Sequence, residues 1–88
     1  MSHHFKISVQ AVDHADAPAL IFNVASHDDL IVTIERVRRM NIVSDKEAPA
    51  FAVGLKLLAE VVIQHRDDPL FADLSNAIPA FIKQLKTR

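Results

Sequence analysis

The chain contains no cysteine, and this absence excludes three kinds of chemistry. Disulfide scaffolds, thiolate metal sites and cysteine nucleophiles all require the missing side chain. A chain without cysteine agrees with a reducing compartment, so we expect the protein in the cytoplasm. Tryptophan and tyrosine are also absent, which leaves neither ring to stack on a base or a sugar. The one glycine is too few for a glycine-rich phosphate cradle, and no motif indicates a cofactor.

An excess of one charge sign and a long hydrophobic run are missing as well. Ten Lys and Arg nearly balance eleven Asp and Glu, giving a formal net charge of -1. Such a chain has no global field that gathers nucleic acid or anionic lipid. The apolar stretch from Ala48 is interrupted by Lys56 and Glu60, well short of the ~20 residues that a membrane span needs. No secretory pattern opens the sequence, so we expect a chain that is neither exported nor membrane-spanning.

The length and the overall composition of the chain are typical of one folded domain. Half of the 88 residues are hydrophobic and 24% are charged. Domains usually contain roughly 100–200 residues, so the chain has room for one core. We therefore expect a single domain over residues 1–88.

The N-terminal quarter alternates between apolar and polar residues. Apolar side chains occupy every second position over residues 5–11, and residues 20–24 repeat the pattern. This period of two is typical of half-buried strands. The intervening residues 13–18 include Asp13, Asp16 and Pro18, which favour a turn here. The pattern predicts an antiparallel β-hairpin.

The apolar residues also indicate a register for this hairpin. One register places Ile7, Val9, Leu20, Phe22 and Val24 on one face, where they can be buried together. Its facing pairs are Val12 with Ala19, Ala11 with Leu20, Val9 with Phe22 and Ile7 with Val24. An isolated two-stranded hairpin is marginal in water, so other elements must cover it.

Start and stop signals predict two helices after the hairpin. Ser26 and Asp29 have the spacing of a capping box, and Asn41 tolerates the left-handed conformation that ends a helix. Ser44 and Glu47 repeat the capping-box spacing before a second helix, which we place at about residues 45–64.

A third helix is predicted after Asp68-Pro69, because an acidic cap followed by proline is a common helix start. Its apolar stripe continues to Leu85. Pro79 lacks an N–H and would clash with the carbonyl of Ser75 in a regular helix. We therefore expect a kink or break near residues 75–78.

The second helix is apolar on nearly all sides. Between Ala48 and Ile63 the charged residues are Lys56 and Glu60. A helix of this kind must lie at the centre of the fold or be covered partly by another chain. Gly54 in its interior suggests close approach of a neighbouring helix or sheet. Together these patterns predict an α+β fold, with an N-terminal antiparallel β-hairpin packed on about three α-helices and a largely buried central helix.

Four stretches resemble a known family. They are His27-Asp28-Asp29, Gly54-Leu55-Lys56-Leu57, Asp68-Pro69-Leu70-Phe71 and Phe81-Ile82-Lys83-Gln84-Leu85-Lys86. With them the chain resembles the bacterial DUF3861 family, a domain of unknown function, over nearly its whole length. The resemblance implies a stand-alone bacterial protein without an assigned activity. It implies no catalytic or binding residue.

One cluster of side chains suggests metal or acid–base chemistry. The predicted register places His3 and His4 at the same end of the hairpin as His27, Asp28 and Asp29. Imidazole and carboxylate groups bind Zn²⁺ or act as general base and orienting acid. The candidate ligands are His4, His27 and Asp28. Against this reading, chain termini usually fray and the aspartates already serve a helix start.

Two other groups of residues have ordinary explanations beside functional ones. Arg36, Arg38 and Arg39 could contact phosphate, but they also complement the helix dipole, and the apolar second helix is unsuited to a DNA groove. Asp13, His14 and Asp16 are candidate ligands in the hairpin loop, where turn chemistry accounts for the aspartates. Nucleic-acid binding is thus an alternative, and a weaker one than self-association.

The leading prediction is a non-enzymatic interaction module. An interior cavity of ~300 Å³ would cost on the order of 7 kcal/mol, which a domain with roughly 5–15 kcal/mol of stability can hardly spare. A groove at the surface or between two subunits escapes that cost. We therefore expect a homodimer or a protein complex that covers the second helix or the hairpin edge, with the enzyme and nucleic-acid functions as alternatives.

Overall fold

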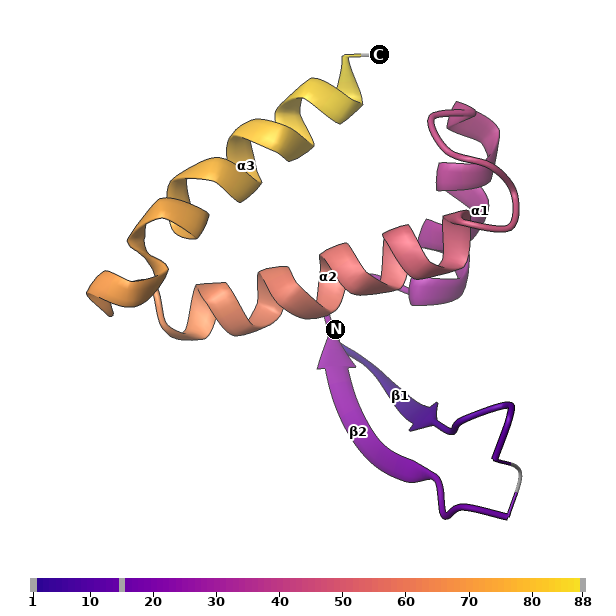
Figure 1. The fold of residues 1–88 in the computed structure, drawn as a ribbon. Coiled ribbons are helices and arrows are strands. Elements are labelled where there is room, and N and C mark those ends of the chain that lie inside the picture. Colours follow the sequence, from indigo (N-terminus) through magenta and orange to yellow (C-terminus); the bar gives the residue numbers. More distant parts are fainter. Residues whose placement is uncertain (1, 15, 88) are drawn as a thin grey trace.

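A computed structural model describes residues 2–14 and 16–87. It contains a two-stranded antiparallel sheet followed by three α-helices, which confirms the α+β fold (Figure 1). The elements are β1 (His3–Val9), β2 (Leu20–Ser26), α1 (Leu30–Met40), α2 (Ala48–Gln64), the short 3₁₀-helix η1 (Pro69–Phe71) and α3 (Ala72–Lys86).

The long helix α2 is the element that the others contact. In Figure 1 α1 lies at its N-terminal end, the hairpin projects from its opposite side to α3, and α3 diverges from its C-terminal end. The core lies between α1 and the start of α2, where Val37, Ala48 and Ala52 are buried. Small alanine side chains at this crossing allow the two helices to approach closely, and partly buried apolar residues pack around them: Ile34, Ile42, Val43 and Phe51.

The helix ends follow the capping chemistry closely. Asp29 caps α1 by accepting from the amide of Ile31 at 3.0 Å, and Asn41 ends it in the left-handed conformation at φ 56°. Ser26 was the wrong choice of cap, since its hydroxyl accepts instead from the amide of Asp28 at 3.2 Å. This bond fixes the turn from β2 into the helix.

The second capping box is confirmed. The Ser44 hydroxyl accepts from the Glu47 amide at 3.2 Å, and the Glu47 carboxylate accepts from the Ser44 amide at 3.1 Å. These hydrogen bonds lower the pKa of Glu47, the bond from the Ser44 backbone most of all and the bond from its hydroxyl next. The regular helix starts at Ala48, three residues later than predicted, because residues 45–47 form a turn within the box.

The hairpin is confirmed but its predicted register is wrong by two residues. Val9 faces Leu20, Ile7 faces Phe22, and Phe5 faces Val24. A two-residue shift leaves every side chain on the same face, so facial patterning does not distinguish the two registers. The observed register gives Phe5 an apolar partner and leaves a longer loop, which is bridged where Gln10 donates to the Ala17 carbonyl at 3.1 Å.

Two expectations for the helices are also wrong. The break expected near residues 75–78 does not occur: helix α3 runs through Pro79, which removes a donor to the Ser75 carbonyl but stands among strong helix formers such as Ala77 and Ala80. A kink at this proline stays a prediction. Gly54 has no close neighbour, since a Cβ built there would meet nothing within 4 Å in the described chain.

Helix α2 is covered on part of its circumference. Ala48, Ala52 and Val62 are buried, whereas Leu58 is 45% and Ile63 is 54% exposed. Among the described residues, no helix combines the length and apolarity needed to cross a membrane.

The chain is more open than its size requires. Its radius of gyration is 14.8 Å, against about 12 Å for a compact domain of this length. Its accessible surface is 6933 Å², against about 5,200 Å² for a folded monomer of 9.8 kDa. About 1,700 Å² of surface per chain is therefore in excess of what a compact monomer exposes.

Candidate functional site

A small polar cluster joins the start of α1 to the middle of α2. Lys56 donates to the carboxylate of Asp28 at 2.5 Å, and Nδ1 of His27 lies 3.4 Å from Oε1 of Glu60. Lys56 and Glu60 are four residues apart, which places both on one face of α2. The two pairs thus connect adjacent residues of the β2–α1 turn to neighbouring turns of one helix.

The hydrogen bond from Lys56 is the main cause of a lowered pKa at Asp28. The charges of Lys56, Arg36 and His27 act in the same direction, and partial desolvation opposes them. An aspartate held in this way remains ionised at neutral pH. It suits a structural ion pair rather than a proton donor.

The described residues give the predicted metal cluster no support. His3 pairs with Ser26 and His4 with Ala25 in the sheet, while His27 and Asp28 point to partners on α2. Within residues 2–14 and 16–87, no group of three or more His, Cys, Asp or Glu side chains lies close enough to hold a metal ion. The metal and acid–base reading therefore stays a prediction.

The arginines lie near the carboxyl end of α1. Arg38 pairs with Glu35 at 2.8 Å, and Arg38 and Arg39 occupy the last turn, where the helix dipole favours cations. Asp13, His14 and Asp16 are exposed in the hairpin loop. Nucleic-acid binding through these arginines also remains a prediction.

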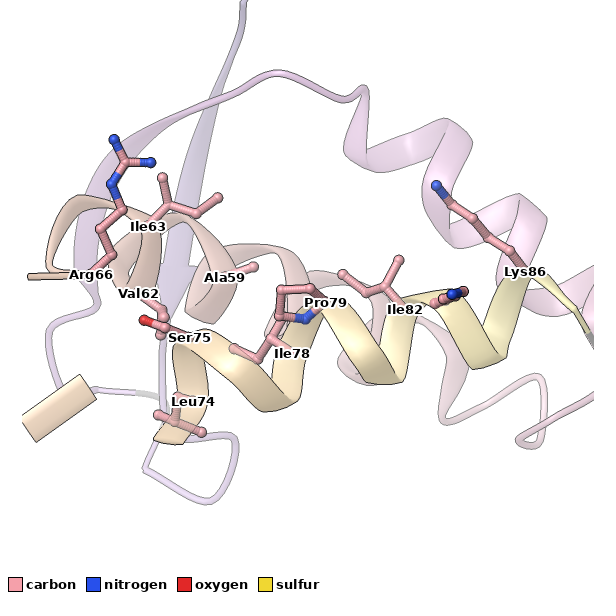
Figure 2. A pocket seen from close by; sticks show the side chains of 11 residues that line it. Ala59, Val62, Ile63, Arg66, Leu74, Ser75, Ile78, Pro79, Ile82 and Lys86 are labelled. Carbon is pink, nitrogen blue, oxygen red and sulfur yellow. The ribbon is translucent and has the colours of Figure 1, made fainter. Parts of the chain in front are cut away.

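A larger feature is an open apolar groove between α2 and α3, which we call the α3 groove (Figure 2). It has a volume of about 590 Å³. Arg66, Lys83 and Lys86 give its edge a positive charge. Its walls are otherwise mainly aliphatic and come from both helices: Ala59, Val62, Ile63, Leu74, Ile78, Pro79 and Ile82.

A second groove of about 660 Å³ lies between α2 and the hairpin. We call it the hairpin groove. Glu60 and His27 of the polar cluster lie at this groove. Its apolar side chains come from β2 and α2: Phe22, Val24, Leu57, Leu58 and Val61.

Sequence reasoning anticipated uncovered apolar surface on α2 but missed its arrangement. It did not separate the two grooves. The divergence of α3 from α2 depends on the turn at η1, which no residue pattern specifies.

These observations define a class of protein: a small α+β chain with a hairpin, three helices and two open apolar grooves, in which the candidates Asp28 and Arg38 form ion pairs. The chain belongs to the DUF3861 family, a domain of unknown function with a solved structure, which it matches over residues 3–87. It is similar to the crystal structure of a protein of unknown function from Pectobacterium atrosepticum SCRI1043, with 35% identity, a TM-score of 0.85 and 100% of each chain covered. Among curated proteins no match was found.

Proposed function

We propose that the protein is a non-enzymatic interaction module of the bacterial cytoplasm that works as a homodimer. The observation that carries this proposal is the excess accessible surface of the chain, 6933 Å² against about 5,200 Å². Large exposed apolar patches on a folded chain commonly mark interaction sites.

The size of the excess matches an interface between two copies. If each chain hides about 1,700 Å², a dimer buries about 3,400 Å² in total, within the roughly 2,000–5,000 Å² of obligate homodimers. The exposed side chains are of the kind that such interfaces contain, for they include Ile63 on α2, Leu74 and Phe81 on α3, and Leu20 and Ile21 on β2.

Light scattering during size-exclusion chromatography tests the proposal. We expect a mass twice the 9.8 kDa of one chain at micromolar concentrations, with an elution volume that stays constant on dilution. A mass of one chain at the highest concentration reached would refute the homodimer. Addition of 1 M salt should leave the dimer intact, because apolar burial is not screened.

A further inference from the structure

Helix α3 has no buried residue, whereas α1 and α2 each have buried side chains. All of its residues belong to the described chain, and none is buried, although Leu74, Ile78, Ile82 and Leu85 form an apolar stripe. An isolated helix of this length is marginal in water, so most of its stability must come from packing. One contact with α2 is the edge-to-face pair of Phe81 and Phe51, whose ring centroids are 6.1 Å apart.

We propose that α3 of a second copy lies antiparallel against α3 and fills the α3 groove, so that each protomer completes the other. This inference rests on the proposed homodimer and names the face that forms it. One wall of the groove and the stripe that fills it belong to the same helix, as a two-fold symmetric contact requires.

The charges of this segment select the antiparallel direction. Asp67, Asp68 and Asp73 lie at its start, and Lys83 and Lys86 lie in its last turn. A parallel pair would place like charges together. An antiparallel pair brings each acidic end to a basic end and also opposes the two helix dipoles.

The apolar spacing fits the same arrangement. In an antiparallel pair centred on Ile78, a residue four positions before the centre meets one four positions after it. Leu74 then lies beside the partner's Ile82, and Ile78 meets its own copy on the two-fold axis. These three residues line the α3 groove in Figure 2.

A small apolar ligand is a weaker occupant than a second copy. Such a molecule would fill the groove but leave the other faces of α3 and most of the excess surface exposed.

Cysteine cross-linking tests the pairing, because the chain has no cysteine of its own. The Ile78→Cys variant should form a disulfide-linked dimer under diamide oxidation, since the two sulfurs meet at the axis. The matched control is Ala80→Cys, on the exposed side of the same helix, which should cross-link at least tenfold more slowly. Equal rates for the two variants would overturn the proposed pairing.

A charge exchange tests the direction and leaves the aliphatic walls of the groove unchanged. The variant Asp67→Lys with Asp73→Lys and the variant Lys83→Glu with Lys86→Glu should each dimerise roughly tenfold more weakly at low salt. Mixed together they should form heterodimers in clear excess over homodimers by native mass spectrometry. The control is Asp13→Lys with Asp45→Lys, which changes charge away from α3 and should leave the dimer unchanged.

The outcomes separate the two proposals. A stable wild-type dimer that neither charge variant weakens would overturn the α3 pairing and leave the homodimer standing. A wild-type monomer would overturn both. If a lipid-like molecule co-purifies and its removal leaves the monomer folded, the groove takes a ligand and the pairing is also wrong.

Discussion

At the scale of single residues, the contact between Asp28 and Lys56 is the clearest polar link between distant parts of the chain. It joins the β2–α1 turn to the middle of α2 across 28 positions of sequence. Both side chains remain partly exposed, so water screens the attraction between them. The pair therefore orients the turn more than it stabilises the fold.

A double-mutant cycle with Asp28→Asn and Lys56→Met measures this pair. Exposed ion pairs contribute about 0.2–1 kcal/mol, so we expect a coupling energy of at most about 1 kcal/mol in urea unfolding. The pair of Glu35 and Arg38, within α1, serves as a control and should give about 0.3–0.5 kcal/mol. A coupling energy above about 3 kcal/mol would mean that Asp28 is buried in the assembled protein.

The same aspartate predicts a pH dependence. Its pKa is lowered from 3.8 in the folded chain, so the unfolded chain binds a proton first as the pH falls. The contribution of Asp28 is therefore complete above about pH 4 and is lost as the pH falls through the folded value. We expect the stability advantage of the wild type over Asp28→Asn to shrink as the pH falls below about 4. An advantage that grows on acidification would contradict this assignment.

At the scale of elements, Gly54 is the weak position of α2. A glycine inside a helix costs about 1 kcal/mol relative to alanine, and here nothing within 4 Å of the described chain would meet the added methyl group. We expect Gly54→Ala to raise the free energy of unfolding by about 0.5–1 kcal/mol. Ala50→Gly, one turn earlier and also exposed, should lower it by a similar amount. A destabilising Gly54→Ala would place another chain directly over this residue.

Helix α1 allows a matched test of its packing. Leu30 is 3% exposed and its neighbour Ile31 is 62% exposed. Truncating a buried leucine costs about 2–5 kcal/mol, whereas truncating a mostly exposed side chain costs far less. We expect Leu30→Ala to destabilise the protein by at least about 2 kcal/mol in urea unfolding, and Ile31→Ala by under about 1 kcal/mol. Similar losses for both would show that Ile31 is covered in the assembled protein.

Local signals predicted the elements well and their packing poorly. Capping chemistry at Ser44, Asn41 and Asp68 acts within a few residues, and the structure confirms each one. The register of the hairpin was missed because a two-residue shift preserves the apolar face around Ile7. The path of α3 was missed because it depends on the geometry of one turn. Both errors concern relations between elements, which short patterns do not encode.

For the candidate site, too, local features were predicted and contacts between elements were not. The apolar run of α2 indicated either a central position in the fold or cover by another chain, and in the structure Leu58 and Ile63 of this helix are exposed. The predicted cluster of histidines and aspartates depended on placing His4 near Asp28. In the structure the carboxylate of Asp28 pairs with Lys56. Charged residues near one another in a predicted fold often serve as structural ion pairs, and the sequence offered no way to choose the partner from α2.

At the scale of the whole molecule, the open shape of the chain is the observation on which the proposed homodimer depends. A chain with principal extents of 41 × 33 × 27 Å exposes apolar residues on α2, α3 and the hairpin together. Domains of this size have little stability to spare, because they bury a smaller fraction of their surface than larger ones. Burial between two copies supplies the contacts that one copy lacks, so folding and association should be coupled.

The most direct test is the concentration dependence of equilibrium urea unfolding. If two folded chains share one core, the stability rises by about 1.4 kcal/mol for each tenfold increase in protein concentration, and the urea midpoint moves upward. We expect this shift between about 1 and 100 µM, together with a single transition at each concentration. A midpoint that stays the same over that hundredfold range would show that one chain is stable alone, and the account would be wrong.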